Sequence, residues 1–192
     1  MYTITYNGKE LEVMTEGSLF SPKEADKGTL AMLRHVSFEA ENKVLDLGCG
    51  TGIVSLIAAA SGVDPKNIVL TDVDPLAVST AEKNMKKNGF EGAVFVVGDA
   101  LTNVPGSGFD LILSNPPYHT DFKVAKTFIE KGFNRLSIGG KMFMVTKRKD
   151  WYKNKLISIF GGVKIYEEDG YFIFESQKRS DKYASGGKKS RR

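Results

Sequence analysis

The sequence predicts an α/β fold, with a doubly wound, mostly parallel sheet of seven strands that ends in an antiparallel hairpin. Three observations support this fold class. From Lys43 onward, short apolar runs alternate regularly with amphipathic segments, as strands and helices do in a parallel sheet. Late in this region, two apolar runs are joined by Glu-Glu-Asp-Gly, which predicts the closing hairpin. Near the start, Asn7-Gly8 predicts a separate hairpin.

The composition indicates one globular domain with an ordinary hydrophobic core. Of the 192 residues, 41% are hydrophobic and 26% are charged, which excludes fibrous, disordered and disulfide-framework classes. The single cysteine, Cys49, cannot form an internal disulfide and fits a reducing compartment. The longest apolar run, Ile53–Ala60, is too short to cross a bilayer, and the N-terminus does not resemble a secretory signal. We therefore expect a soluble, cytoplasmic protein without a membrane partner.

Residues 1–40 are expected to pack on the sheet as a hairpin followed by a helix. The strands Thr3–Tyr6 and Glu10–Met14 flank the Asn-Gly turn. The segment from Pro22 to about Phe38 reads as a helix, with His35 on its face.

Residues 41–177 hold the alternating elements and form the main domain. The predicted strands are Val44–Leu47, Ile68–Leu70, Val94–Val97, Leu111–Leu113, Met142–Val145, Val163–Tyr166 and Tyr171–Phe174. The predicted helices run from the Gly-rich turn at 48–52 to about Ser61, from Pro75 to Gly89, from Phe122 to Leu136, and from Trp151 to Phe160. Asp74 caps the second of these helices, and Gly139-Gly140 are expected to end the third.

The net charge of +4 is concentrated at the C-terminus. From Gln177 to Arg192 there are seven Lys or Arg residues and a single acid, Asp181, so the rest of the chain is slightly acidic. This end is rich in Ser, Gly and Lys and cannot bury a core. We expect residues 178–192 to be a basic, flexible tail, which either solubilises the chain or binds a phosphate backbone.

A glycine-rich turn, Asp46-Leu-Gly48-Cys-Gly50-Thr-Gly52, joins the first core strand to its helix. Ligands of parallel sheets bind beyond the carboxyl ends of the strands, and such glycines let a ligand approach the backbone amides. A dinucleotide-binding turn has two residues before its third glycine, whereas this turn has one, which argues against a pyrophosphate site. A purely structural strand-to-helix turn is the alternative.

Carboxylates follow the next two strands. Asp72 ends the second core strand, where a carboxylate can accept hydrogen bonds from both hydroxyls of a ribose. Asp99 and Ala100 follow the third strand, where the carboxylate can accept from the amino group of adenine while Val73 packs on the ring. The alternatives are a second helix-capping residue for Asp72 and a solvated turn acid for Asp99.

Asn115-Pro116-Pro117-Tyr118 follows the fourth core strand. The prolines fix the backbone and remove donors, so local carbonyl groups face outward as acceptors. The Asn115 amide oxygen and the Pro116 carbonyl can then accept from one planar amino group, and Tyr118 offers a ring on which a base or amide can stack. These four residues are the predicted catalytic site.

A second basic cluster, Lys147-Arg148-Lys149 with Lys153 and Lys155, follows the fifth core strand. This cluster either forms a solvated helix face or contacts the phosphates of a nucleic acid.

Together these motifs resemble the class I S-adenosylmethionine-dependent methyltransferases, with their Rossmann-like fold. They resemble more closely the small methyltransferase domain of the bacterial ribosomal RNA guanine-N2 methyltransferases. Further segments carry the likeness: Gly17-Ser-Leu-Phe20-Ser21, Asp26-Lys-Gly28-Thr29, His119 and the closing hairpin. The sequence departs from the family pattern in two ways. Family members often carry a second, non-catalytic half that helps to hold RNA, and this chain is too short to include one. Lys27 also stands where family members more often have a small or apolar residue.

The resemblance implies S-adenosylmethionine as cofactor, ribosomal RNA or a ribosomal subunit as partner, and no metal. It assigns the methionine end of the cofactor to Asp46, Gly48, Cys49 and Gly50, with Thr29 nearby. The ribose then falls to Asp72, the adenine to Val73, Asp99 and Ala100, and the acceptor amine to Asn115–Tyr118, with Asn115 also near the cofactor. Three alternatives remain open: adenine N6 as acceptor, a protein glutamine amide as acceptor, or a non-catalytic RNA-binding assembly protein on the same scaffold.

Overall fold

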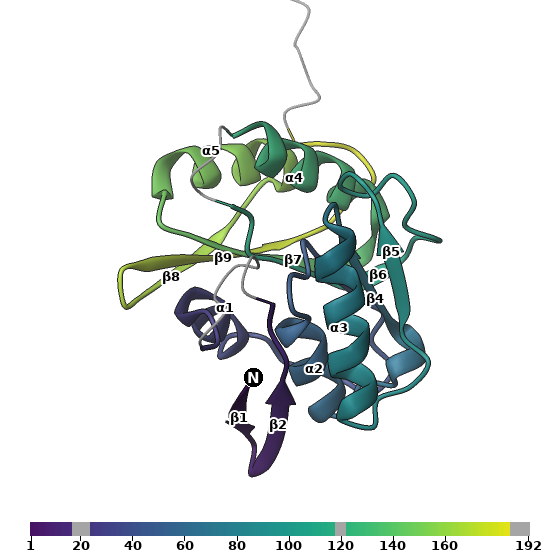
Figure 1. The fold of residues 1–192 in the computed structure, drawn as a ribbon. Helices are drawn as coiled ribbons and strands as arrows, with labels where there is room; N and C mark the ends of the chain where they lie inside the picture. The colour runs from purple at the N-terminus through teal and green to yellow at the C-terminus, as the bar shows by residue number, and fades with distance from the viewer. Residues whose placement is uncertain (17–23, 118–121, 185–192) are drawn as a thin grey trace, which may run out of the picture.

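The computed structural model describes residues 1–16, 24–117 and 122–184. It contains a seven-stranded sheet covered by helices on both faces (Figure 1), in the order β5-β4-β3-β6-β7-β9-β8. The strands are β3 (Val44–Leu47), β4 (Ile68–Asp72), β5 (Val94–Val97), β6 (Phe109–Ser114), β7 (Leu136–Thr146), β8 (Lys164–Glu168) and β9 (Tyr171–Gln177). Strands β3 to β7 are parallel to one another, whereas β9 is antiparallel to β7 and β8. The predicted mostly parallel seven-stranded sheet and its closing hairpin are confirmed.

The sheet separates two layers of helices. The helices are α1 (Lys27–Leu33), α2 (Ile53–Ala60), α3 (Pro75–Lys87), α4 (Lys123–Arg135) and α5 (Lys149–Phe160), with a short 3₁₀ helix at Pro65–Asn67. Helices α1, α2 and α3 pack into one apolar core, and α4 and α5 pack into a second core on the other face. The chain builds outward from β3 to β5 on one side and from β6 to β7 on the other. This change of direction at β3 and β6 is where α/β sheets bind ligands.

The N-terminal hairpin forms a small sheet of its own, with β1 (Tyr2–Tyr6) and β2 (Lys9–Val13). Its turn is confirmed, because Asn7 and Gly8 have φ angles of 49° and 75°. Asn84 of α3 and the C-cap residue Asn88 hold this segment through its backbone. The Asn88 side chain exchanges hydrogen bonds of 2.9 and 2.8 Å with the backbone of Glu12. The buried Asn84 side chain does the same with Met14, over 2.7 and 3.0 Å.

Helix α1 is shorter than predicted. The expected helix from Pro22 to Phe38 begins only at Lys27, after the N-cap Asp26, and ends at Leu33. Pro22 itself lies outside the described residues. His35 was expected on the helix face, but it lies beyond the end of the helix.

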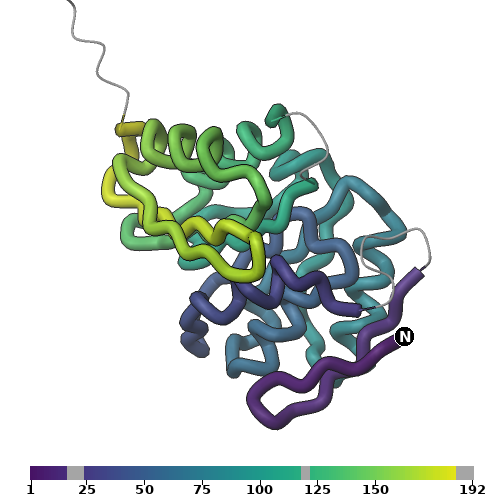
Figure 2. The backbone as a smooth tube through the Cα atoms, turned by 90° about the vertical axis from the view of Figure 1, so that its left-hand side faces the viewer, coloured from purple at the N-terminus to yellow at the C-terminus, as the bar shows by residue number. Residues whose placement is uncertain are grey.

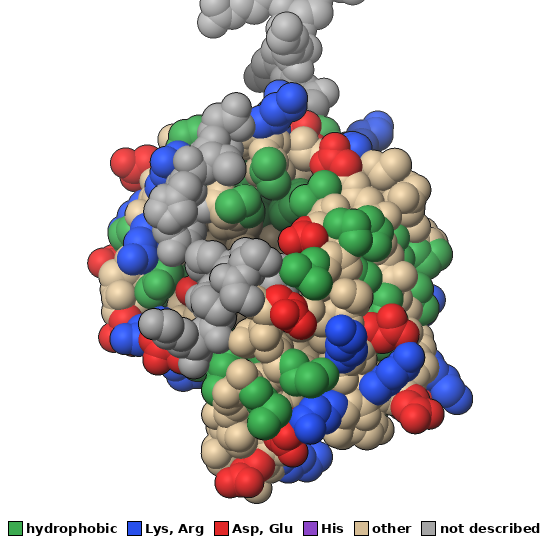
Figure 3. Space-filling view, viewed as in Figure 1, with side chains coloured by type: hydrophobic (Ala, Val, Ile, Leu, Met, Phe, Trp, Pro, Cys, Tyr) green, Lys and Arg blue, Asp and Glu red, His purple; other side chains and the backbone are tan. Residues whose placement is uncertain are grey.

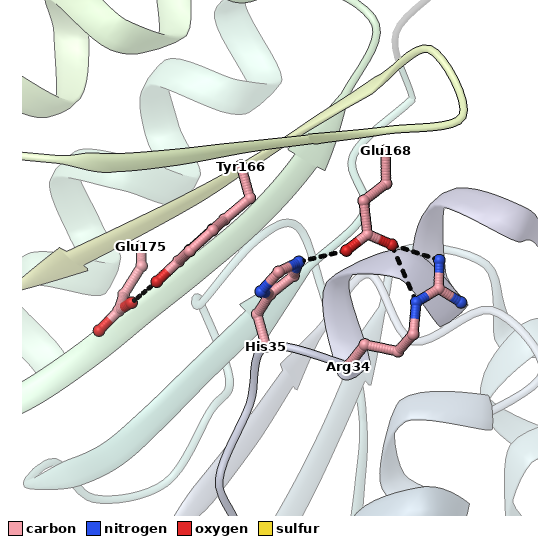
Figure 4. A network of polar contacts seen from close by, with 5 residues as sticks. All are labelled: Arg34, His35, Tyr166, Glu168 and Glu175. Carbon is pink, nitrogen blue, oxygen red and sulfur yellow. Dashed lines mark hydrogen bonds and ion pairs between the residues drawn. The ribbon is translucent and has the colours of Figure 1, made fainter.

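His35 belongs to a polar network that joins the segment after α1 to the closing hairpin (Figure 4). Its ring stacks on Tyr166 at a centroid distance of 4.0 Å, and its Nε2 lies 2.6 Å from the Glu168 carboxylate. Arg34 donates to the same carboxylate, and Tyr166 donates to Glu175 over 2.8 Å. Figure 2 shows the β8–β9 hairpin running alongside α1, so this network holds α1 against the sheet.

Strand β7 begins earlier than predicted. The expected helix end at Gly139-Gly140 is wrong, because α4 ends at Arg135 and both glycines lie inside β7. Gly140 packs so tightly against β6 that a Cβ atom there would lie 2.7 Å from the Phe109 carbonyl oxygen. Gly140 therefore serves a close approach of two strands, and not a helix stop.

The expected tail begins too early at residue 178. Lys178 is buried, and its Nζ donates to the Leu136 carbonyl oxygen over 2.9 Å. Tyr183 packs edge-on against Phe133 and donates to the Glu130 carbonyl oxygen over 3.1 Å. Residues 178–184 are thus part of the folded body.

Within the described part of the chain, no helix is long and apolar enough to span a bilayer.

Candidate functional site

A pocket of about 620 Å³ opens at the carboxyl ends of β3, β4 and β6, at the point where the sheet changes direction. Figure 3 shows the hollow, with hydrophobic and acidic side chains around its opening. The predicted site residues that line the pocket are Thr29, Asp46, Gly48, Cys49, Gly50, Asp72, Val73, Asp99, Ala100, Asn115, Pro116 and Pro117. The structure thus brings together every predicted site residue except Tyr118, which lies outside the described residues.

The glycine-rich turn folds over the end of β4. The backbone amides of Gly48 and Cys49 both donate to the Thr71 carbonyl oxygen, over 2.9 and 3.0 Å. The amide of Gly50 donates to Asp72 over 3.0 Å, so this turn and the β4 carboxylate fix each other. At Gly52 the backbone has a φ of 82°, and a Cβ atom would lie 2.9 Å from the Cβ of Ala81. Only glycine fits this approach of α2 to α3.

Asp46 is a buried carboxylate at the floor of the pocket, and 2% of its surface is exposed. It accepts hydrogen bonds from the Ser55 hydroxyl, over 2.8 Å, and from the Ser55 amide, over 3.3 Å. Burial raises the pKa of the Asp46 carboxyl to about 7, against the opposing effect of these hydrogen bonds. A cationic ligand nearby would favour its ionised form.

Cys49 also lines the pocket, and burial raises the pKa of its thiol well above the ordinary value. The nearby carboxylates of Asp46 and Asp72 act in the same direction. A thiol with a raised pKa is a poor nucleophile, so Cys49 contributes shape and not reactivity.

Asp72 and Asp74 accept hydrogen bonds from different parts of the backbone. Asp74 caps α3 by accepting from the Leu76 amide over 2.8 Å, as predicted. Asp72 accepts from Gly50 through one oxygen and from the Asp74 amide through the other, over 3.0 Å. Each carboxylate oxygen has further lone pairs available toward the pocket. Val73, between them, exposes 69% of its surface at the pocket opening.

The turn after β5 places its acid at the surface of the pocket. The side chain of Asp99 is exposed, whereas its carbonyl oxygen accepts from the Thr102 hydroxyl over 2.7 Å. Ala100 has a φ of 54°, which is uncommon for a residue with a Cβ atom. Its carbonyl oxygen accepts from the Thr71 hydroxyl over 3.4 Å, which ties this turn to the end of β4.

The Asn115 side chain is held by α1. Its Nδ2 donates to Asp26 Oδ1 over 2.7 Å and to the Thr29 hydroxyl oxygen over 2.9 Å. The same Asp26 oxygen accepts from the Thr29 amide over 2.8 Å and thereby caps α1. Both amide hydrogens of Asn115 are therefore engaged, and its Oδ1 can still accept a hydrogen bond.

Several lining residues were not predicted. Asp26 orients Asn115; in the sequence it stood only in the segment Asp26-Lys-Gly28-Thr29, which carries the family likeness, and inside an expected helix. Val124 and Phe128 come from α4, and the Phe128 ring would lie 3.6 Å from a Cβ atom at Gly48. Phe128 lies in the predicted helix from Phe122 to Leu136, and nothing in the sequence distinguishes it from a core position of that helix.

The pocket carries negative charge. Asp26, Asp46, Asp72 and Asp99 line it, and no Lys or Arg of the described residues does. No group of three His, Cys, Asp or Glu side chains suited to a metal ion occurs in the part of the chain that the structure describes. The pocket is therefore suited to a polar or cationic organic ligand and not to a phosphate group.

Comparisons with known proteins agree with this architecture. Two similar proteins are the ribosomal RNA small subunit methyltransferases C of Psychromonas ingrahamii, 31% identical, and of Cronobacter sakazakii, 34% identical. The matches cover 89% and 87% of this chain and 49% of each relative. A solved structure of the Thermus thermophilus 16S rRNA N2-guanine methyltransferase RsmC, in complex with AdoMet and guanosine, is 25% identical with a TM-score of 0.85. It matches over 93% of this chain and 50% of its own.

This chain spans about half the length of the relatives that it matches. A family model described as the methyltransferase small domain matches residues 10–175, which include the whole sheet except the end of β9. The sheet order, the pocket at its change of direction and this match lead to one conclusion: the chain belongs to the methyltransferase small domain family.

Proposed function

We propose that this protein transfers a methyl group from S-adenosylmethionine to the exocyclic N2 amine of guanine in ribosomal RNA. The main support for the proposal is that one pocket combines two features. It is an acidic cavity at the point where the sheet changes direction, and Asn115 lines it. Asp26 and Thr29 hold the Asn115 amide nitrogen, so its side-chain oxygen is available as an acceptor. We place the protein in the cytoplasm, where ribosomal RNA is available.

The pocket fits S-adenosylmethionine in size and charge. Its volume of about 620 Å³ lies within the range of cofactor sites, and its four carboxylates match a ligand with a sulfonium and an ammonium group. When bound, this cofactor supplies a methyl group on positively charged sulfur, which is already activated for transfer. We assign the ribose hydroxyls to the free lone pairs of Asp72 and the adenine amino group to Asp99. The Gly48–Gly50 turn and Asp46 would then surround the methionine end.

The orientation of Asn115 indicates how the methyl-accepting amine would be held. An exocyclic amine is a poor nucleophile, because its lone pair is delocalised into the ring. Asn115 Oδ1 and the Pro116 carbonyl oxygen would each accept one hydrogen of this amine. They hold the nitrogen in line with the methyl group and stabilise the positive charge that develops on it. The proton can leave after transfer, so these residues need no general base among them.

Guanine in ribosomal RNA is supported by the relatives and not by the pocket alone. The named relatives act on small-subunit ribosomal RNA, and the RsmC structure holds guanosine together with AdoMet. Two acceptors around a planar amine would suit adenine N6 or a glutamine amide equally well, so the acceptor needs its own test. The base must also leave its stack to reach the pocket, which favours loops and partly assembled particles.

The test combines binding with product analysis. Calorimetry should detect S-adenosylmethionine and no comparable binding of NAD. Labelled methyl donor is then incubated with deproteinised ribosomal RNA and with small subunits, and the nucleosides are separated. N2-methylguanosine supports the proposal, whereas N6-methyladenosine or unlabelled RNA contradicts it.

A variant isolates the acceptor site within this assay. Asn115→Ala should abolish transfer with little change in cofactor affinity, because it removes the amine acceptor and leaves the acidic cavity. Near-normal methylation by this variant would exclude the assigned role of Asn115.

A further inference from the structure

Resting on the proposed function, we propose that a basic and aromatic surface beside the pocket binds the single-stranded RNA that flanks the target base. We call this surface the basic rim and define it by Lys123, Lys147, Arg148, Lys149 and Lys153, together with Phe122 and Trp151. All five basic side chains are exposed, and the rings of Phe122 and Trp151 are half-buried.

The register of the sheet places the rim next to the acceptor motif. Strands β6 and β7 are parallel neighbours, and Ser114 pairs with Met144 at their carboxyl ends. Asn115 follows Ser114 directly, and Lys147 begins the rim three residues after Met144. Neighbouring strands lie about 5 Å apart, so the rim starts within a few residues' reach of the proposed amine site.

A stack of aromatic rings joins the two parts of the rim. The rings of Phe122, at the start of α4, and Trp151, in α5, are stacked at a centroid distance of 4.3 Å with an interplanar angle of 11°. The Arg148 guanidinium lies over the Phe122 ring at 5.0 Å. This arrangement holds a planar cation and an indole at one place on the surface, and both are groups on which unpaired RNA bases stack.

The charge of the pocket explains why phosphate contacts must lie outside it. Four carboxylates line the cavity, and they would repel the backbone of a bound RNA strand. The rim has the opposite character, because residues 147–153 hold four basic residues and one acid, Asp150. The exposed Glu167 lies 3.8 Å from Lys149, which makes a weak ion pair at the surface. Figure 3 shows Lys and Arg side chains on the same face as the hollow.

These observations divide recognition between two surfaces. The pocket accepts one unstacked base, while the rim contacts the phosphates of the adjoining nucleotides through Lys147, Lys149 and their neighbours. Arg148 and Trp151 stack on a neighbouring base without reading its identity. The rim therefore contributes affinity and register for unpaired RNA, and the pocket contributes the choice of base.

The experiment compares two triple variants that remove the same charge. The rim variant carries Lys147→Gln, Arg148→Gln and Lys149→Gln. The control variant carries Lys43→Gln, Lys66→Gln and Lys131→Gln, three exposed lysines away from the carboxyl edge of the sheet. Affinity for a short oligouridine with one central guanine is measured by fluorescence anisotropy over a series of salt concentrations, and the affinity for S-adenosylmethionine is measured in parallel.

The rim variant should lose about tenfold or more in RNA affinity at moderate salt. Its slope of log affinity against log salt should become shallower by about 1.4, because the variant removes the two phosphate contacts assigned to Lys147 and Lys149 and each contact on a single strand contributes about 0.7. The control variant should keep the parent's slope. Arg148→Lys retains the charge and should keep the slope, but it should weaken binding because the planar stack is lost.

Three results would overturn the inference: equal slopes for the rim variant and the parent, an equal loss in the control variant, or a parent chain without salt-dependent RNA binding. Failure of the proposed function has a different signature. A chain that binds no S-adenosylmethionine and labels no RNA disproves the enzyme, whatever the two triple variants do to RNA affinity.

Discussion

Asp26 and Asn115 are 89 residues apart in sequence, and the amide of Asn115 donates to the carboxylate of Asp26 over 2.7 Å. This bond joins the N-terminal segment to the end of β6. Because Asp26 also caps α1, one carboxylate oxygen both begins a helix and orients the residue that we assign to the acceptor amine.

Asp26→Ala should therefore reduce both stability and turnover. Loss of the cap costs about 1 kcal/mol, and the freed Asn115 amide can rotate away from its productive orientation. We expect the rate of methyl transfer to fall on the order of tenfold to a hundredfold, with a smaller loss of cofactor affinity because one of the four pocket carboxylates is removed. Radiolabel transfer and calorimetry measure the two quantities.

Asp26→Asn is the matched control for this position. The asparagine oxygen can still cap α1 and accept from Asn115, so it should restore most of the activity. An Asp26→Ala variant with parental turnover would show that Asn115 needs no such support.

Asp46→Asn should change how stability depends on pH. The pKa of this carboxyl is raised by burial from 3.8 to about 7, so between these values the folded state binds more protons than the unfolded state. Its contribution to stability is complete below pH 3.8 and is lost as the pH rises to about 7. The variant should be more stable than the parent at pH 8, and this advantage should vanish toward pH 4. Urea unfolding at several pH values measures the difference.

Cofactor affinity provides an independent readout for the same residue. A cationic ligand favours the ionised carboxylate, so affinity in the parent should increase as the pH rises through about 7. Asp46→Asn should flatten this profile. A parallel pH dependence in parent and variant would assign the titration to another group.

Gly52→Ala and Gly50→Ala separate backbone strain from steric overlap. Both glycines have positive φ angles, of 82° and 53°, so each alanine carries about 1–2 kcal/mol of strain. At Gly52 the new methyl group also meets Ala81 at 2.9 Å, whereas the space around Gly50 is open. We expect Gly52→Ala to destabilise the fold by about 2–4 kcal/mol and Gly50→Ala by no more than the strain. Equal losses in denaturant unfolding would contradict the overlap at α3.

Glu168→Gln tests the network that holds α1 on the closing hairpin. The Arg34 guanidinium and then the His35 ring lower the pKa of this carboxyl, so its stabilising effect is present above its usual pKa of 4.5 and is lost as the pH falls below it. Because the group lies at the surface, the melting temperature at pH 7 should fall by no more than about 2 °C, and the difference should close in acid. Glu41→Gln, at another exposed position, should have no effect. A constant difference down to low pH would rule out the ionic contribution.

The sequence was a good guide to the sheet and to the residues on its strand ends. Strands such as Val44–Leu47 are short apolar runs buried on both faces, and that pattern is local. The residues after them are placed by topology, because the carboxyl ends of parallel strands meet at one edge. Asp46, Asp72, Asp99 and Asn115 therefore line one pocket as expected.

The errors and omissions concern contacts between distant segments. Asp26 supports Asn115 only because α1 packs beside β7 and β9, which no local pattern records. Gly139-Gly140 resembles a helix stop, and only the nearby β6 backbone explains why Gly140 stands in a strand. Lys178 belongs to a basic run, yet it is buried because the Leu136 carbonyl and Asp181 compensate its charge.

The opposite charges of the cavity and of the surface beside it have a consequence for turnover. Dissolved ions weaken attraction between exposed groups strongly and attraction inside an enclosed space much less. A polyanion on the outside would then exchange readily, while a small cation within stays bound. Under the proposed function, the protein can therefore bind and release several strands before it transfers the single methyl group that it holds. The spent cofactor has lost its sulfonium charge and must be exchanged before the next transfer.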